Sequence, residues 1–101
     1  MSDYVLSSDA ASDLNGIWDY IAADSVDAAD RMVETLFDAF EALAKMPGMG
    51  HRREDLTTYP VRFWPVGSYL VIYRTERSFI EIAAVAHGSR DIPTFLQHRT
   101  T

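Results

Sequence analysis

The sequence changes character once, at residues 46–50, and this change limits the folds that the chain can adopt. The segment reads MPGMG, and its proline and two glycines end a helix. Before it, apolar residues recur at helical spacing, whereas β-branched and aromatic residues dominate after it. A chain with its helices in one half and most of its strands in the other is typical of an α+β domain.

The first half predicts a short strand followed by a helical hairpin. Residues 3–7 alternate as a strand does, and the Ser-Ser-Asp sequence at 7–9 is typical of a helix start. Apolar stripes at three- and four-residue steps predict helices at about 9–23 and 26–45. The connection between them is short, so the two helices form an antiparallel pair.

The second half predicts three strands joined by tight turns. Residues 56–74 hold two apolar runs separated by Gly67 and Ser68, which indicates a hairpin. Residues 75–78 form the next turn, and residues 79–87 form the third strand. The predicted fold is one domain over residues 1–101, with the order β-α-α-β-β-β. Its twisted sheet is mainly antiparallel, the helical hairpin packs on one face, and the tail at 90–99 adds one short helical turn.

Charge is distributed unevenly along the chain. The net charge is −6, yet residues 1–50 carry ten acids and two basic residues, and residues 51–101 carry five acids and seven arginines. The two halves therefore have net charges of −8 and +2. Proteins that track phosphates usually carry many lysines and arginines. The composition argues against broad or sequence-specific nucleic-acid binding, but it leaves a local anionic contact open in the second half.

Other residue types narrow the class further. The absence of cysteine excludes disulfides and thiolate metal sites. Residues 1–20 hold four aspartates and no lysine or arginine, unlike a secretory signal, and the apolar stretches are too short to span a bilayer. We expect a soluble cytoplasmic protein without a cofactor or a metal.

Three stretches, in this order, resemble the RelE/ParE superfamily of toxins from type II toxin–antitoxin modules, and most of all its ParE branch. They are LSSDAASDLNGIWDYIA (6–22), MGHRREDL followed by PVRFWPVGSYLVIYR (49–74) and AVAHGSRDIP (84–93). The resemblance implies a small toxin neutralised by a ParD-like antitoxin encoded beside it, in modules linked to plasmid stabilisation. ParE-like toxins are associated with poisoning DNA gyrase, whereas RelE-like toxins cleave messenger RNA on the ribosome.

The end of the last predicted strand raises the question of catalysis. His87 could act as a general acid or base, with Arg62, Arg74 and Arg90 holding a phosphate. In the alternative, its imidazole bonds a nearby backbone group and Gly88 supplies a turn. We expect no catalytic residue, because the chain offers His87 no convincing acid–base partner. The RelE branch usually has several basic residues, whereas this chain has one lysine, and glycine follows His87 where tyrosine would be expected. A RelE-like endoribonuclease is the alternative, and a non-toxic homologue that only binds antitoxin is a further one.

The basic residues of the second half are the candidates for contact with the target. Arg62 and Arg74 lie within apolar strands, where each can form an anion-facing patch or a structural ion pair, for example to Glu81. The loop at 51–55 can likewise be a contact region or merely solvated. The candidate target contacts are His51, Arg52, Arg53, Arg62, Arg74, His87 and Arg90.

The aromatic residues are too many for one side of the sheet. Phe63 and Trp64 are adjacent on a strand and so face opposite sides. One face of the sheet meets the helices, so either the tail or a partner must cover the other. The candidate antitoxin contacts are Trp18, Phe37, Phe40, Trp64, Tyr69 and Tyr73.

Overall fold

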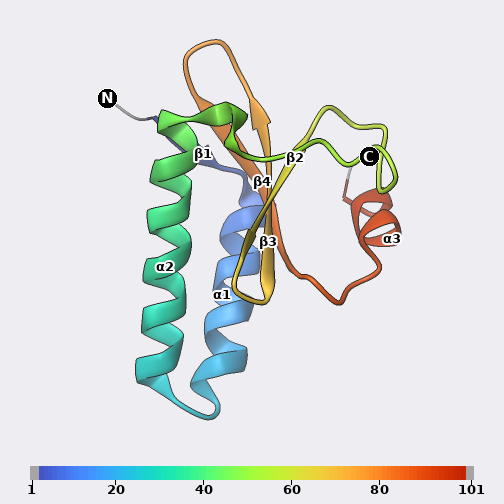
Figure 1. Ribbon diagram of the computed structural model, residues 1–101. Helices are drawn as coiled ribbons and strands as arrows, with labels where there is room; N and C mark the ends of the chain where they lie inside the picture. Colours follow the sequence, from blue (N-terminus) through green and yellow to red (C-terminus); the bar gives the residue numbers. More distant parts are fainter. Residues whose placement is uncertain (1–2, 100–101) are drawn as a thin grey trace.

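The structure is a computed structural model that describes residues 3–99, and it is built around one four-stranded sheet (Figure 1). Its strands are β1 (Tyr4–Leu6), β2 (Arg62–Val66), β3 (Tyr69–Thr75) and β4 (Ile80–His87). They lie in the order β1-β4-β3-β2, with β1 parallel to β4 and the other pairs antiparallel. The α+β class and the order of elements predicted from the sequence are confirmed.

The helices lie on both faces of this sheet. The helices α1 (Ser8–Ala22) and α2 (Val26–Lys45) form the predicted hairpin on one face, and α3 (Ile92–Gln97) lies on the other (Figure 1). A 3₁₀ turn, η1 (Pro47–Met49), follows α2. Serine hydroxyls cap the N-termini of both long helices. The hydroxyl of Ser7 accepts the N–H of Ala10, and the hydroxyl of Ser25 accepts the N–H of Ala28.

Two hydrophobic layers separate these elements. The larger layer lies between the helical hairpin and the sheet and includes Leu36, Phe40, Leu43, Tyr73 and Ile82, all fully buried. The smaller layer lies between the sheet and α3. It consists of Val61, Phe63, Ile72, Ala84, Ala86, Ile92, Phe95 and Leu96. The tail of the chain therefore covers the second face of the sheet within one molecule.

The segment before β2 departs from the strand-like composition of the sequence. Residues 56–61 lie outside the sheet, and β2 begins only at Arg62. The carbonyl of Arg53 accepts the N–H groups of Leu56 and Thr57, which forms a turn, and Pro60 has no N–H to offer a neighbouring strand. In the part of the chain that the structure describes, no helix is long and apolar enough to cross a membrane.

Candidate functional site

A buried tyrosine fixes the loop that follows α2. The hydroxyl of Tyr73 donates to the carbonyl of Pro47 at 2.7 Å and accepts the N–H of Gly50 at 2.9 Å. A Cβ atom on Gly50 would lie 2.5 Å from the same hydroxyl, so glycine is required there. Burial, above other causes, raises the pKa of the Tyr73 phenol. The phenol therefore stays protonated and can donate near neutral pH.

Two further contacts hold this loop against β2. Arg62 Nη1 donates to the carbonyl of Gly50 at 2.9 Å. His51 and Phe63 exchange two backbone hydrogen bonds of 3.0 and 2.8 Å. The path of the backbone is thus fixed on both sides of Gly50, and this brings Arg52 to the wall that Arg62 also forms.

Three arginines line one small cavity at this end of the sheet. Arg52 comes from the loop, Arg62 from β2 and Arg74 from β3, and the cavity has a volume of about 220 Å³. Arg74 forms an ion pair with Glu81, as one interpretation of the sequence had it, and Glu76 is the acid on the cavity wall. Arg62 uses one of its five N–H donors on Gly50, so the others remain for an anion.

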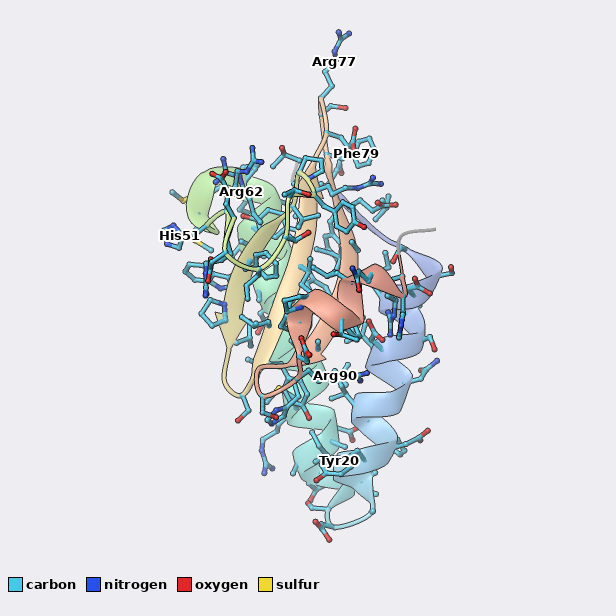
Figure 2. All side chains as sticks on the ribbon, turned by 90° about the vertical axis from the view of Figure 1, so that its right-hand side faces the viewer. Tyr20, His51, Arg62, Arg77, Phe79 and Arg90 are labelled. Carbon is cyan, nitrogen blue, oxygen red and sulfur yellow. The ribbon has the colours of Figure 1, made fainter. Side chains whose placement is uncertain are left out.

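The neighbouring basic residues of the loop lie outside this cavity. Arg53 turns back to the carboxylate of Asp55 with two hydrogen bonds of 2.9 and 2.7 Å, and this contact lowers the pKa of Asp55. The His51 side chain is exposed beyond the edge of β2 (Figure 2). Of the 51–53 segment, only Arg52 therefore joins the other two arginines.

His87 and Arg90 lie at the opposite end of the sheet. His87 is the last residue of β4, its Nδ1 accepts the backbone N–H of Ser89 at 3.1 Å, and the hydroxyl of Ser89 lies 2.7 Å away. This is the local turn contact that one interpretation of the sequence anticipated. The guanidinium of Arg90 lies 4.8 Å from the centroid of the Phe95 ring, near the start of α3.

The register of the strands separates His87 from the arginine cavity. His87 pairs with Tyr69 at one end of β3, whereas Glu81 pairs with Arg74 at the other. Glu81 and His87 are six residue steps apart along β4, which corresponds to about 20 Å. Figure 2 shows Arg62 and Arg90 at opposite ends of the sheet. The structure does not assemble the set of His87, Arg62, Arg74 and Arg90 that phosphate chemistry would need.

A second cavity, which the sequence did not reveal, lies beside His87. It has a volume of about 440 Å³ and is bounded by α1, the end of β4 and the segment around α3. Asp13 stands at its wall, accepts the N–H of Val85 at 2.9 Å and binds both terminal nitrogens of Arg99 at 3.0 and 2.7 Å. Asp13 and Arg99 are 86 residues apart, so only the fold shows that they meet.

Half of the aromatic residues expected at an antitoxin surface are in the core. Phe40 and Tyr73 are fully buried and Tyr69 is 8 % exposed, because all three face the layer between the sheet and the helical hairpin. Their side chains offer a partner little or no surface in this structure, which corrects the expectation that the sequence pattern suggested. The alternation of the strands was right, but the helices cover these three side chains.

The other three aromatic candidates keep some exposed surface. Trp18 and Phe37 line a shallow groove between α1 and α2, and the indole N–H of Trp18 donates to Asp30 at 2.8 Å. Trp64 is partly buried against the layer beneath the helical hairpin. Within residues 3–99, no group of three or more histidines, aspartates or glutamates is placed to hold a metal ion.

Comparison with known proteins identifies relatives of this arrangement. Residues 4–92 match the model of the family described as the ParE toxin of type II toxin–antitoxin system, parDE. Among solved structures, the chain resembles one described as the chromosomal ParDE TA system from P. aeruginosa, with a TM-score of 0.72 and 20 % identity. That match covers 86 % of this chain and 96 % of the other. No curated protein sequence matches the chain.

Proposed function

Because the chain belongs to the ParE toxin family of type II toxin–antitoxin systems, we propose that it inhibits growth by binding and poisoning DNA gyrase. In this proposal a ParD-like antitoxin neutralises it, and both events take place in the cytoplasm. The observation that carries the proposal is the family match over residues 4–92. No cofactor and no catalytic residue are needed, because the toxin acts by holding its target.

The arginine cavity is the proposed contact with the target. Guanidinium groups bind carboxylates and phosphates through paired hydrogen bonds, and three of them converge on this cavity. Arg52 is the most available of the three, since it has no hydrogen bond or ion pair with any residue the structure describes. Arg52, Arg62 and Arg74 would grip one anionic group of gyrase, or of the DNA that gyrase holds.

The separation of His87 from this cavity supports a toxin that works by binding. A general base has to lie within hydrogen-bond reach of the proton that it removes, at about 2.6–3.2 Å. His87 lies roughly six strand residues, or about 20 Å, from the arginines that would hold a phosphate. It also uses Nδ1 within its own turn.

The test compares two activities of the purified chain. One assay follows supercoiling and DNA cleavage by gyrase, and the other follows messenger RNA cleavage on translating ribosomes. We expect gyrase inhibition with intact messenger RNA, unchanged in His87→Ala. Ribosome-dependent cleavage that His87→Ala abolishes would replace this proposal with a RelE-like endoribonuclease. If the chain affects neither activity and its induction leaves growth normal, the chain is a non-toxic homologue that only binds its antitoxin.

Adjacent arginines give a matched pair for the contact itself. Arg52→Ala should weaken gyrase inhibition at least about tenfold, which corresponds to about 1.4 kcal/mol of binding free energy. Arg53→Ala removes the same side chain one residue away, outside the cavity, and should leave inhibition unchanged. Equal effects of the two substitutions would show that the cavity is not the contact.

A further inference from the structure

The outer side of β4 is only partly covered by another strand. β1 pairs with Ile80, Glu81 and Ile82 and then ends. Beyond that point, side chains pair with the outward backbone groups of β4. The hydroxyl of Ser7 donates to the carbonyl of Ala83 at 2.8 Å, and the carboxylate of Asp13 accepts the N–H of Val85 at 2.9 Å. Side chains of the α1 region thus occupy the positions of a missing strand.

The next two groups along this side face the cavity beside His87. In an antiparallel strand, the N–H and C=O of one residue point to the same side, and alternate residues point to opposite sides. Because the N–H of Val85 points toward Asp13, the carbonyl of Val85 and the N–H of His87 also point away from β3. Both residues line the cavity of about 440 Å³. Together they present one acceptor and one donor at strand spacing.

The opposite wall of the cavity contains a glycine that the fold does not need. Gly16 lies in the middle of α1, where glycine costs about 1 kcal/mol relative to alanine. A Cβ atom added there would meet nothing within 4 Å. Internal packing therefore gives no reason for this glycine, whereas close approach of another backbone does. Tyr20, one turn further along α1, is 78 % exposed at the same wall (Figure 2).

The charge of this cavity favours an acidic occupant. His87 and Arg90 stand at the end where β4 stops, and Ser89 lies between them. The acid at the wall, Asp13, is already neutralised by its paired hydrogen bonds with Arg99. An acidic side chain next to Arg90 would thus meet a cation that forms no ion pair with any residue the structure describes.

The other side of the sheet is closed to strand addition. His51 occupies both outward groups of Phe63 on β2. The next outward position of that strand is Pro65, which has no N–H to donate. A partner strand can therefore extend the sheet beside β4, but it cannot do so beside β2.

We propose that the groove between α1, the end of β4 and α3 receives an extended segment of the antitoxin, which pairs with β4 at Val85 and His87 and places an acidic side chain on Arg90. Main-chain hydrogen bonds would give affinity, and close packing over Gly16 with the charge of Arg90 would give specificity. The proposal rests on the proposed function, because it takes an antitoxin to be the partner.

Two glycines with empty surroundings provide the test. Gly16→Met fills the groove, whereas Gly48→Met adds the same side chain on η1, where a Cβ also meets nothing within 4 Å. Calorimetric titration with the purified antitoxin encoded beside the toxin should show a dissociation constant at least about tenfold higher for Gly16→Met. Gly48→Met should bind as the wild type does, and thermal melting should show both variants folded.

Two further measurements address the charge and the backbone pairing. Arg90→Glu should weaken antitoxin binding, whereas Arg77→Glu, at the exposed tip of the β3–β4 hairpin, should not (Figure 2). Hydrogen exchange should show the amide of His87 protected only in the complex, because a paired strand takes its N–H.

The outcomes separate the inference from the proposed function. If the wild type does not bind the antitoxin at all, the proposed function fails. If the wild type binds and Gly16→Met binds equally well with an unprotected His87 amide, the inference is overturned and the proposed function stands. If Gly16→Met keeps antitoxin binding but loses gyrase inhibition, the groove belongs to gyrase. If it loses a dimer that the wild type is found to form, the groove belongs to a second copy. Either result would also overturn the inference.

Discussion

At the scale of single residues, Tyr73 connects three parts of the chain through one hydroxyl. Its two hydrogen bonds join β3 to the loop at Pro47 and Gly50. Tyr73→Phe leaves the N–H and the C=O of these residues without their partner, so the free energy of unfolding should fall by about 1–3 kcal/mol. Urea denaturation followed by circular dichroism measures this. Tyr20→Phe, at an exposed tyrosine, is the control, and an equal loss in both variants would contradict the role of the Tyr73 hydroxyl.

The same hydroxyl predicts a loss of stability in alkali. Burial raises the pKa of Tyr73 above its ordinary value of 10.0, so the unfolded chain releases this proton at lower pH than the folded chain does. The contribution of Tyr73 is fully present below pH 10 and is lost as the pH rises through the folded pKa. Unfolding free energies measured across this range should therefore decline with pH, and Tyr73→Phe should show a shallower decline. Parallel curves for the two proteins would refute the assignment.

Sequence patterns predicted the strand of Tyr73 but not its environment. The sequence placed Tyr73 in a strand, which is confirmed, but named it as an antitoxin contact, whereas its side chain is fully buried. Its hydrogen-bond partners lie 23 and 26 residues earlier in the chain, in a loop whose path no local signal specifies. The meeting of Arg52 with Arg62 and Arg74 was hidden for the same reason, since the Tyr73 contact positions that loop.

At the scale of elements, two serines cap the two long helices, but only one of them also binds the sheet. Ser25 caps α2 only, whereas Ser7 caps α1 and also donates its hydroxyl to Ala83 of β4. Ser25→Ala should cost about 1 kcal/mol, as the loss of an N-cap does. Ser7→Ala should cost about 1 kcal/mol more, because it also leaves the Ala83 carbonyl unpaired. Chemical denaturation of the two variants measures the difference, and identical costs would mean that the bond to β4 contributes nothing.

Local signals predicted the elements well because each has its own start or stop. Ser7, Ser25 and Pro47 mark helix boundaries, and Gly67, with a φ of +57°, makes the turn between β2 and β3. Two features escaped this approach. Residues 56–61 look like a strand but follow the turn that the Arg53 carbonyl closes. The parallel pairing of β1 with β4 joins residues that are 76 positions apart, such as Tyr4 and Ile80, and no turn chemistry specifies such a pairing.

At the scale of the whole molecule, Arg99 ties the end of the chain to its first helix. Its two terminal nitrogens donate to the carboxylate of Asp13, and its guanidinium carbon lies 4.3 Å from the centroid of the Phe95 ring. Arg99→Met keeps the apolar stem but leaves the partly buried Asp13 without its cation. The free energy of unfolding should fall by about 1–3 kcal/mol, and the amides of α3 should exchange faster. Arg53→Met is the control, because the pair of Arg53 with Asp55 is solvent-exposed, so this substitution should leave the melting temperature unchanged. Equal behaviour of the two variants would contradict a structural role for the Asp13–Arg99 pair.

The closed side of the sheet also limits how these molecules can join one another. A sheet with two open sides behaves like a bifunctional monomer, which can grow into a fibre of any length. His51 and Pro65 close the β2 edge of the sheet, so each molecule has one edge left for pairing. Once a strand has been added beside β4, no further molecule can join that sheet. The largest species that such pairing produces is a dimer, and it forms only by occupying the place proposed for the antitoxin. Chains without a partner would thus stay in small, reversible species instead of growing into fibres.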